Sequence, residues 1–195
     1  MSYLSLIHVG KSEAARLRLS DAYAWHQRLW ETFPGQDGQP RNFLFRVEDR
    51  HDAFRIYLLS PGAPQTPDWG HWQTKAIAPS FLDHDRYCFH LRANPTMRRD
   101  TDHRRLGIFD ESRLHSWFRR KAAEHGFEAP PQALTIGAPT EEIFVRSGRR
   151  GKHVAVDFAG VLMVRDRARF RDTYHHGIGS AKAFGFGLLL LAPVV

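Results

Sequence analysis

The sequence predicts an α+β protein built from two small ferredoxin-like domains in tandem, residues 1–94 and 95–195. Two observations lead to this prediction. The chain has 195 residues, enough for two compact halves of roughly 100 residues, which is a common domain size. Each half also carries a βαβ-like pattern with a hairpin inside it, which is typical of ferredoxin-like (βαββαβ-type) domains, although no sequence repeat links the halves.

The first half begins with a strand followed by a helix. Apolar and polar side chains alternate over residues 2–9, as they do in a half-buried strand. Residues 22–33 have helical periodicity, and either Ser20 or Asp21 supplies the N-cap oxygen. Pro34 ends this helix, because proline cannot continue one.

Three further strands complete the first half. Residues 42–48 and 54–60 alternate in the same way and are separated by a short polar turn, which predicts a hairpin. The proline- and glycine-rich residues 61–69 form a loop. Alternation resumes at residues 87–92, which we assign as the last strand of the first domain.

A charged segment, residues 94–102, contains a proline and is the best candidate for the linker between the domains. A helix is expected over residues 110–125, where an apolar stripe runs along one face and Gly126 follows as a C-cap. A short strand at residues 134–137 comes next.

The second half ends with a hairpin, a helix and a last strand. The hairpin arms are residues 143–146 and 153–164, and the helix covers residues 167–176. A glycine-rich loop at residues 177–187 then leads to a strand at residues 188–191, which completes the second half.

Cysteine content and hydropathy limit the class of protein. Cys88 is the only cysteine, so neither an intramolecular disulfide nor a cysteine-rich zinc site can form, and a reducing compartment is expected. The longest apolar stretch, residues 188–195, is far shorter than the ~20 residues that span a bilayer. Residues 1–10 lack the features of a signal peptide. We therefore expect a cytoplasmic protein that does not bind a membrane.

Charge is the first positive indication of function. The formal net charge is +7, and the excess lies in the second half: residues 1–97 hold 11 Lys or Arg and 10 Asp or Glu, whereas residues 98–195 hold 17 and 11. Most of the basic residues are arginine, whose planar guanidinium group binds phosphate in a bidentate manner and stacks on bases. Because no basic amphipathic helix accompanies this charge, nucleic acid is favoured over a membrane surface. The alternative is a solvated surface that is simply rich in arginine.

Tyr23 and His26 are the candidate catalytic residues. Side chains three positions apart lie on the same side of a helix, so the hydroxyl and the imidazole can converge on one spot. Imidazole can both accept and give a proton near neutral pH, and a phenol can donate to a developing oxyanion. The alternative is a half-buried histidine on an aromatic-rich helix without a catalytic role.

The glycine-rich loop is a candidate phosphate-binding segment. Its glycines allow the backbone to approach a ligand closely, and Lys182 adds a positive charge. The binding candidates are Gly177, Gly179, Ser180 and Lys182. The loop matches neither a Walker A motif nor a dinucleotide-binding fingerprint. The alternative is a structural turn that packs the last strand.

The tip of the predicted second-half hairpin carries four cations, Arg146, Arg149, Arg150 and Lys152. On a projecting two-stranded ribbon, these side chains could enter a groove of a nucleic acid. A solvated hairpin tip is the alternative reading.

No metal or other cofactor is predicted. The chain has 12 histidines, but neither the adjacent pair His175 and His176 nor His84 between its two aspartates forms a known ligand pattern. A Gly-x-Ser-x-Gly nucleophile motif is also missing from the sequence.

Several motifs occur in a familiar order. A Tyr-x-x-His-x-x-Leu-Trp helix at residues 23–30 is followed by Phe-Leu-Phe-Arg-Val-Glu at 43–48 and by Leu-Arg-Ala-Asn-Pro at 91–95. Gly-Ile-Gly-Ser-Ala-Lys at 177–182 and Gly-Leu-Leu at 187–189 end the series. Over the whole chain this order resembles the CasE family, the CRISPR RNA-processing endoribonucleases of type I-E systems within the repeat-associated mysterious protein (RAMP) superfamily.

The resemblance implies tandem ferredoxin-like domains of the RRM-like kind. It also implies binding of the stem-loop of CRISPR repeats in precursor CRISPR RNA, and metal-independent cleavage at the 3′ base of the stem that leaves a 2′,3′-cyclic phosphate and a 5′-hydroxyl. His26 matches the general acid/base histidine of the family and Tyr23 the tyrosine beside it. The resemblance also implies that the protein remains bound to the processed RNA and is a subunit of the Cascade surveillance complex.

The resemblance extends to the two binding segments. Arg149, Arg150 and Lys152 lie where family members insert cations into the RNA groove, and Lys182 with its glycines matches the loop that lies along the RNA. One departure is Met97, which stands where relatives often carry lysine, with Arg98 or Arg99 as the replacement.

Two other functions stay open at this point. One is a catalytically silent subunit that binds an RNA hairpin, and the other is a metal-dependent hydrolase that uses the histidines.

Overall fold

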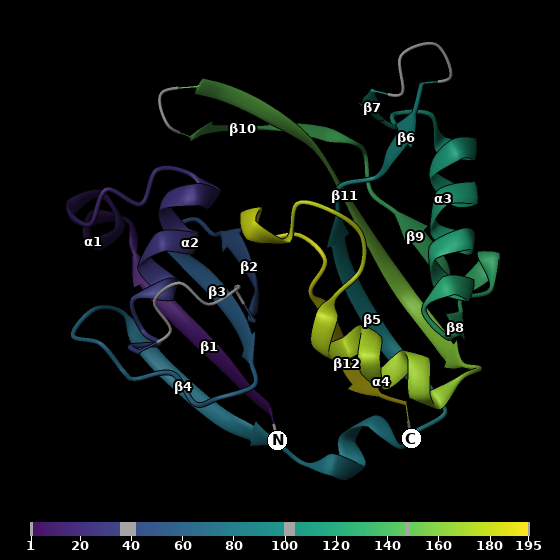
Figure 1. Ribbon diagram of the computed structural model, residues 1–195, viewed down its shortest axis with the longest axis horizontal. Coiled ribbons are helices and arrows are strands. Elements are labelled where there is room, and N and C mark those ends of the chain that lie inside the picture. The colour runs from purple at the N-terminus through teal and green to yellow at the C-terminus, as the bar shows by residue number, and fades with distance from the viewer. Residues whose placement is uncertain (1, 36–41, 100–103, 147–148, 195) are drawn as a thin grey trace.

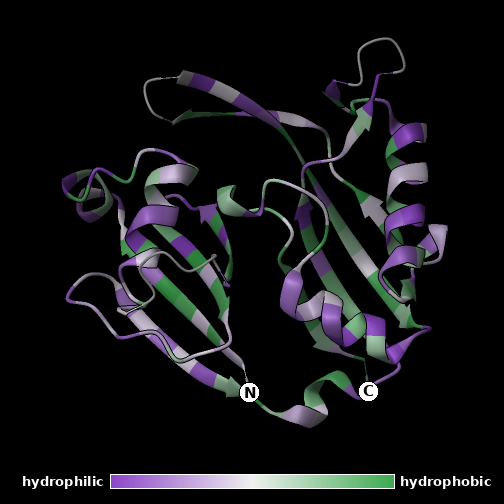
Figure 2. Cartoon of the chain, viewed as in Figure 1, coloured by the Kyte–Doolittle hydropathy of each residue, from purple (hydrophilic) through white to green (hydrophobic). Residues whose placement is uncertain are grey.

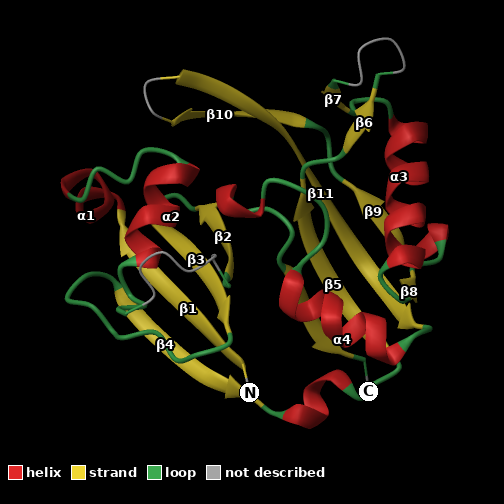
Figure 3. Ribbon diagram, in the orientation of Figure 1, coloured by secondary structure: helices red, strands yellow, loops and turns green. Residues whose placement is uncertain are grey.

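Two antiparallel sheets dominate the computed structural model, which describes residues 2–35, 42–99, 104–146 and 149–194. The sheets lie side by side and are joined at one end by a segment that runs from β4 through the short turn η1 (Pro79–Leu82) to β5 (Figure 1). Figure 3 shows α1 and α2 on the N-terminal unit and α3 and α4 on the C-terminal unit. The chain therefore forms two units of mixed helix and strand.

The N-terminal sheet has the strand order β2-β3-β1-β4, with antiparallel neighbours throughout. Its strands are β1 (Ser2–Gly10), β2 (Leu44–Asp49), β3 (Ala53–Ser60) and β4 (His71–Ile77). Two helices, α1 (Lys11–Arg16) and α2 (Ala22–Trp30), connect β1 to β2. The order is that of a ferredoxin-like βαββαβ unit, except that a loop without helix at residues 61–70 replaces the second helix.

The C-terminal sheet has the strand order β10-β11-β5-β12, and the short strands β8 and β9 also pair with β11. Its strands are β5 (Arg86–Ala93), β8 (Phe127–Glu128), β9 (Leu134–Ile136), β10 (Thr140–Arg146), β11 (Arg149–Val164) and β12 (Leu189–Pro193). The helices α3 (Glu111–Glu124) and α4 (Arg167–His176) cover this sheet. A separate hairpin of β6 (Thr96–Arg98) and β7 (Arg105–Gly107) precedes α3.

Strand β11 belongs to two structures at once. Its second part, from Val156 onward, pairs with the central strand β5. Its first part, from Arg149 to Ala155, pairs with β10 and extends beyond the sheet as a two-stranded ribbon that arches toward α1 and α2 (Figure 1). This ribbon brings a segment of the C-terminal unit over the helices of the N-terminal unit.

The N-terminal unit has its own hydrophobic core. Trp25 and Leu29 of α2 are buried there against residues of β1 and β3 such as Ile7 and Ile56. Burial of a large apolar side chain contributes about 1.5–3 kcal/mol to folding. In Figure 2 the hydrophobic residues lie along the strands, as this packing requires.

The second core includes residues of both units. Trp117 and Phe118 of α3 stack on Phe158 of β11, with ring centroids 5.6 and 5.0 Å apart. Leu44 of β2 and Leu59 of β3 belong to the same buried cluster. One face of the N-terminal sheet thus packs against the C-terminal core, which fixes the two units relative to each other.

The expected domain boundary at residue 94 is wrong. The strand expected at residues 87–92 exists as β5, but it pairs with β11 and β12 of the C-terminal sheet. The fourth strand of the N-terminal sheet is instead β4, which we did not expect because most of its side chains are exposed and polar. We place the boundary between β4 and β5, at residues 78–85.

Two further segments differ from expectation. Residues 96–98 of the expected linker form β6, which pairs with β7. Residues 11–16 form the short helix α1, which the sequence does not predict. The remaining helices and hairpins lie within a few residues of their predicted positions. No helix in the described part of the chain is long and apolar enough to cross a membrane.

Candidate functional site

Helix α2 positions the two candidate catalytic side chains. Its N-cap is Asp21, whose carboxylate accepts a hydrogen bond from the Ala24 N–H at 2.9 Å, which satisfies one of the free amides at the helix start. The helix packs Trp25 into the core, which turns the neighbouring face toward the C-terminal unit. On that face the rings of Tyr23 and His26 stack with centroids 6.4 Å apart. The two rings are therefore neighbours on one face of the helix, as their spacing in the sequence predicts.

Aromatic rings surround His26. Its ring centroid lies 5.6 Å from that of Phe43, 6.1 Å from Phe45 and 6.2 Å from Trp30. Both ring nitrogens are shielded from solvent. A substrate atom therefore reaches them only if the covering atoms move aside.

The glycine-rich loop closes on itself. The Ile178 N–H donates to the Gly187 carbonyl at 2.9 Å, and the Gly187 N–H donates to the Arg92 carbonyl of β5 at 2.8 Å. Gly177 and Gly187 have φ of +74° and +87°, and a Cβ on either would lie within 2.8 Å of the opposite carbonyl oxygen. These two glycines are needed for the close approach of the loop ends, so the structural reading of the loop is correct for them.

The middle of the same loop lies beside helix α2. It contains the short turn η3 (Lys182–Phe184), preceded by Ala181 in the left-handed region with φ of +59°. The ring of Phe184 lies 6.3 Å from that of Tyr23. The structure thus brings Tyr23 next to the turn that begins with Lys182.

Asn94 ties this loop to β11. Its Oδ1 accepts from the Val154 N–H at 3.2 Å, and its Nδ2 lies 3.3 Å from His153 Nδ1 and 3.4 Å from Ser180 Oγ. Because Oδ1 is occupied as an acceptor, Nδ2 is the donor, and His153 Nδ1 accepts from it. Burial lowers the pKa of His153, with Glu142 opposing the shift, which favours the neutral ring that this hydrogen bond requires.

A basic groove opens on the outer side of the loop. Cations from the β6–β7 hairpin, from α3 and from the loop itself line it, together with Asn94, Ser180, Gly177 and Gly179. The groove cations are Arg98, Arg105, Arg113, Arg119, Arg120, Lys121 and Lys182. Glu124 is the only acidic residue of the described lining. Such a concentration of positive charge binds the phosphates of a nucleic acid.

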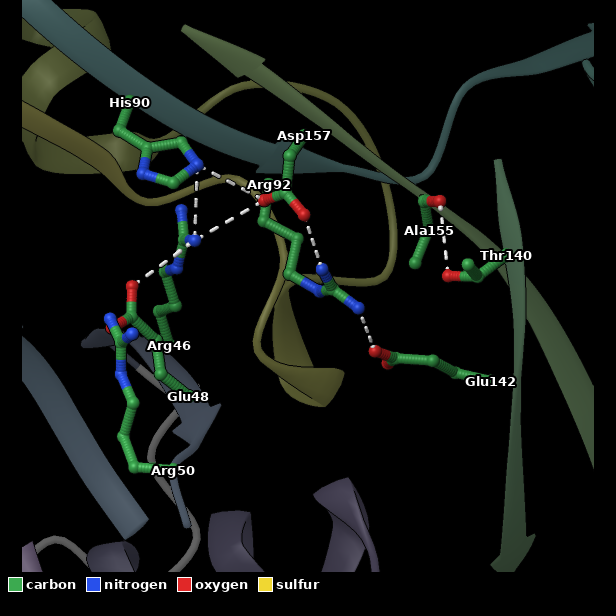
Figure 4. A network of polar contacts seen from close by, with 9 residues as sticks. All are labelled: Arg46, Glu48, Arg50, His90, Arg92, Thr140, Glu142, Ala155 and Asp157. Atoms are coloured by element: carbon green, nitrogen blue, oxygen red, sulfur yellow. Dashed lines mark hydrogen bonds and ion pairs between the residues drawn. The ribbon is translucent and has the colours of Figure 1, made fainter. Parts of the chain in front are cut away.

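An ion-pair network joins the two sheets near the site (Figure 4). Arg46 of β2 is almost fully buried and lies 3.2 Å from both Glu48 and Asp157 of β11. Arg92 of β5 contacts Asp157 at 2.6 Å and also pairs with Glu142 of β10. Four strands from two units therefore meet at one set of charges.

In this network each buried charge favours the ionised form of its neighbours of opposite sign. Burial alone would raise the pKa of Asp157, but the hydrogen bond with His90 and the charges of Arg92 and Arg46 outweigh it, so the pKa is lowered. Burial lowers the pKa of Arg46, while Asp157 and Glu48 oppose the shift. The carboxylate stays ionised and holds both guanidinium groups.

Comparisons with known proteins agree with the fold and with the order of the motifs. The family model described as "CRISPR associated protein" matches residues 2–193. The chain belongs to this family.

Curated members of the CRISPR-associated protein family align with nearly the whole chain. The "CRISPR system Cascade subunit CasE" of Escherichia coli is 30% identical over 96% of this chain and 100% of its own length. The "CRISPR-associated endoribonuclease Cse3" of Thermus thermophilus is 29% identical over 93% and 95%.

Solved structures give the same result. A structure of the CRISPR endoribonuclease Cse3 bound to a 19-nucleotide RNA covers 98% of this chain and 100% of its own, with 25% identity and a TM-score of 0.86. The crystal structure of Cas6e from Escherichia coli covers both chains fully, with 29% identity and a TM-score of 0.72. The tandem ferredoxin-like fold is confirmed.

In this member of the family, the hairpin cations are described only in part. Arg150 and Lys152 are exposed on β11, and Lys152 pairs with Glu141 of β10 at 2.6 Å. The side chains of Arg146 and Arg149 and all of residues 147–148 lie outside the described structure.

Sequence analysis missed most of the basic groove. Arg113 and Arg120 stand seven residues apart on α3 and so share one face of the helix. That spacing could have identified them, but only the apolar stripe of this helix was considered in the sequence. Asn94 was noticed as part of a motif, not as a site residue. The described residues contain no group of three or more His, Cys, Asp or Glu that could hold a metal ion.

Proposed function

We propose that this protein is an endoribonuclease that binds the stem-loop of CRISPR repeats in precursor CRISPR RNA and cleaves at the 3′ base of the stem without a metal ion. The observation that carries the proposal is the position of Tyr23 and His26, stacked on α2 beside the loop that holds Lys182. The two side chains proposed for proton transfer thus lie next to a loop whose Lys182 lines the basic groove. The relatives named as endoribonucleases, one of them bound to RNA, support this reading.

The chemistry is a transesterification. The 2′-oxygen of the nucleotide before the cleavage site attacks the phosphorus, and the bond to the 5′-oxygen of the next nucleotide breaks, which gives a 2′,3′-cyclic phosphate and a 5′-hydroxyl. One proton leaves the 2′-hydroxyl and one reaches the departing oxygen. His26 supplies the imidazole for proton transfer, and Tyr23 donates a hydrogen bond to the phosphate. Lys182 offsets the charge that develops on the phosphate oxygens.

Recognition of the RNA is assigned to the C-terminal unit. Side chains cannot easily read base edges in the deep major groove of an A-form stem, so shape and phosphate contacts dominate. The basic groove supplies those contacts, and the ribbon carrying Arg150 and Lys152 adds cations at a distance from it. The product RNA stays bound, and the protein acts in the cytoplasm as a subunit of Cascade. The name of the Escherichia coli relative supports the last point, because it calls that protein a Cascade subunit.

A direct test uses a repeat stem-loop RNA incubated with the protein in excess EDTA. We expect cleavage at the 3′ base of the stem and a cyclic phosphate on the upstream product, identified by mass spectrometry. A substrate with a 2′-deoxy nucleotide before the scissile phosphate should bind and stay intact. Cleavage of the deoxy substrate, or no cleavage of the ribose substrate in EDTA, would contradict the mechanism.

One observation favours a second candidate function, a silent RNA-hairpin-binding subunit. Both ring nitrogens of His26 are shielded from solvent, as they would be if the histidine only packed in the core. Tight binding of the stem-loop with no cleavage under any condition would favour this alternative.

A further inference from the structure

Asp21 connects the catalytic helix to the ribbon. One carboxylate oxygen accepts from the Ala24 N–H of α2 at 2.9 Å, as an N-cap does. The other oxygen accepts from the N–H of Val145 on β10 at 3.0 Å. These partners belong to different units and are 121 residues apart in the sequence. A single side chain thus holds the first turn of α2 against β10, one of the two strands of the ribbon.

A second contact follows the same route through aromatic rings. Phe144, next to Val145 on β10, lies 4.3 Å from Phe184 of the glycine-rich loop, and Phe184 lies 6.3 Å from Tyr23. Phe144 also stacks on His153 of β11 at 4.6 Å. The ring fits there because position 151 is glycine, since a Cβ on Gly151 would overlap the Phe144 ring.

The two contacts reach the catalytic side chains by short paths. Asp21 is two residues before Tyr23 and five before His26, all within α2 or its cap. Val145 is five residues from Arg150 in the sequence and is its direct partner in the register of the ribbon. A shift of the ribbon therefore reaches the first turn of α2 by two routes. One is the Asp21 carboxylate, and the other is the series of ring contacts from Phe144 through Phe184 to Tyr23.

We propose that Asp21 is a positioning residue. Through its hydrogen bond to β10 it aligns the first turn of the catalytic helix, and with it Tyr23 and His26, with the ribbon. The inference rests on the proposed function. At this cap two separate N–H groups use the two oxygens of one carboxylate. A cap that served α2 alone would need one.

Asp21→Asn separates the two roles of the side chain. Asparagine is as good an N-cap as aspartate, so one amide oxygen still accepts from Ala24. The amide NH₂ then faces the Val145 N–H, and two donors cannot bond. Asp21→Ser is the second variant, because its hydroxyl caps the helix and offers no second acceptor on the side of β10.

The test measures binding and cleavage separately. For both variants we expect the dissociation constant for the repeat stem-loop to stay within about twofold of wild type, since the groove cations are intact. The single-turnover cleavage rate at saturating RNA should fall about tenfold or more, because reaction rates respond steeply to misplaced reacting groups. Thermal melting should show that the variants stay folded.

The matched control is Asp166→Asn, the same change at the N-cap of α4, where the carboxylate accepts from the Arg169 N–H at 3.0 Å. This variant should cleave at the wild-type rate. Equal slowing by Asp166→Asn, or wild-type cleavage by both Asp21 variants, would overturn the inference.

Amide hydrogen exchange keeps this test distinct from that of the proposed function. In Asp21→Asn the Val145 amide should exchange faster while the Ala24 amide keeps its protection. If the wild-type protein cleaves no repeat RNA, the proposed function fails, and with it the positioning role in cleavage. Unchanged protection of Val145 would overturn the link in either case.

Discussion

The two units share a strand order but differ in charge and in exposed chemistry. With the boundary placed between β4 and β5, residues 1–85 carry 9 Lys or Arg and 10 Asp or Glu, whereas residues 86–195 carry 19 and 11. The nearly neutral unit holds Tyr23 and His26, and the basic unit holds the groove and the ribbon. Under the proposed function one architecture serves both cleavage and RNA binding, because surface side chains and not strand order decide what each unit does.

The comparison also shows where the roles meet. The glycine-rich loop leaves the basic unit and lies against α2, and the ribbon of the same unit reaches the cap of that helix. The proposed cleavage by one unit of RNA that the other unit binds therefore depends on a fixed arrangement of the two units.

The largest effect is expected from His26→Ala in the N-terminal unit. Removal of a general acid or base lowers the rate by about 10²–10⁴-fold, while the affinity for the stem-loop should hardly change because the groove is intact. Single-turnover cleavage and a binding titration measure the two quantities. His51→Ala, in the exposed turn between β2 and β3, is the control and should cleave normally. Undiminished cleavage by His26→Ala would assign the chemistry to other residues.

Next in size is a loss of stability when the contact between the units is cut. Arg46→Met leaves Asp157 and Glu48 without their shared cation, and breaking a buried ion pair on one side costs about 3 kcal/mol. The free energy of unfolding in urea measures this loss. Arg28→Met removes an exposed pair with Glu31 and should cost less than about 1 kcal/mol. Equal losses would show that the network does not hold the units together.

A smaller effect is expected in the basic unit. Arg113→Ala combined with Arg120→Ala removes two groove cations, which should weaken RNA binding about tenfold and reduce the salt dependence of the affinity. Cleavage at saturating RNA should stay near normal. The double change Arg165→Ala and Arg169→Ala removes the same charge from the region of α4, outside the groove lining. If both pairs weaken binding equally, total charge and not the groove decides affinity.

The smallest effect is a loss of stability in mild acid, and it should come from the C-terminal unit. Burial lowers the pKa of His125, His153 and His175, and neighbouring cations lower that of His125 further. As the pH falls below about 6.5, the unfolded chain binds more protons than the folded one. The free energy of unfolding therefore decreases from there until the pH reaches the lowered pKa values of these histidines in the folded state. Urea titrations at pH 7.5 and pH 5.5 measure the difference. His175→Gln should flatten the dependence, and an unchanged slope would contradict this origin.

Sequence alone predicted the fold class and most elements, because alternation and helical periodicity are strong where one face is buried. It failed where that signal is weak. Edge strand β4 exposes most of its side chains, so no alternation marks it. Strand β5 shows clear alternation, but alternation does not say which sheet a strand joins. That is decided by long-range pairing with β11 and β12.

The site shows the same limit. The pair Tyr23 and His26 was predictable because residues three apart on a helix are neighbours. The basic groove was not, because it combines α3, the β6–β7 hairpin and the loop near the C-terminus. Asp21 was expected as a possible cap, but its second partner, Val145, lies in a distant strand.

The ribbon formed by β10 and the first part of β11 has one further consequence. Ile143 and Val145 are about half exposed there, whereas Val156 and Phe158 farther along β11 are fully buried. Few buried contacts protect the outer backbone hydrogen bonds, so they break at a lower free energy than those of the sheet. The ribbon is therefore expected to open and close many times for each global unfolding event. We expect this opening to be confined to the outer end of the ribbon while the sheet stays intact.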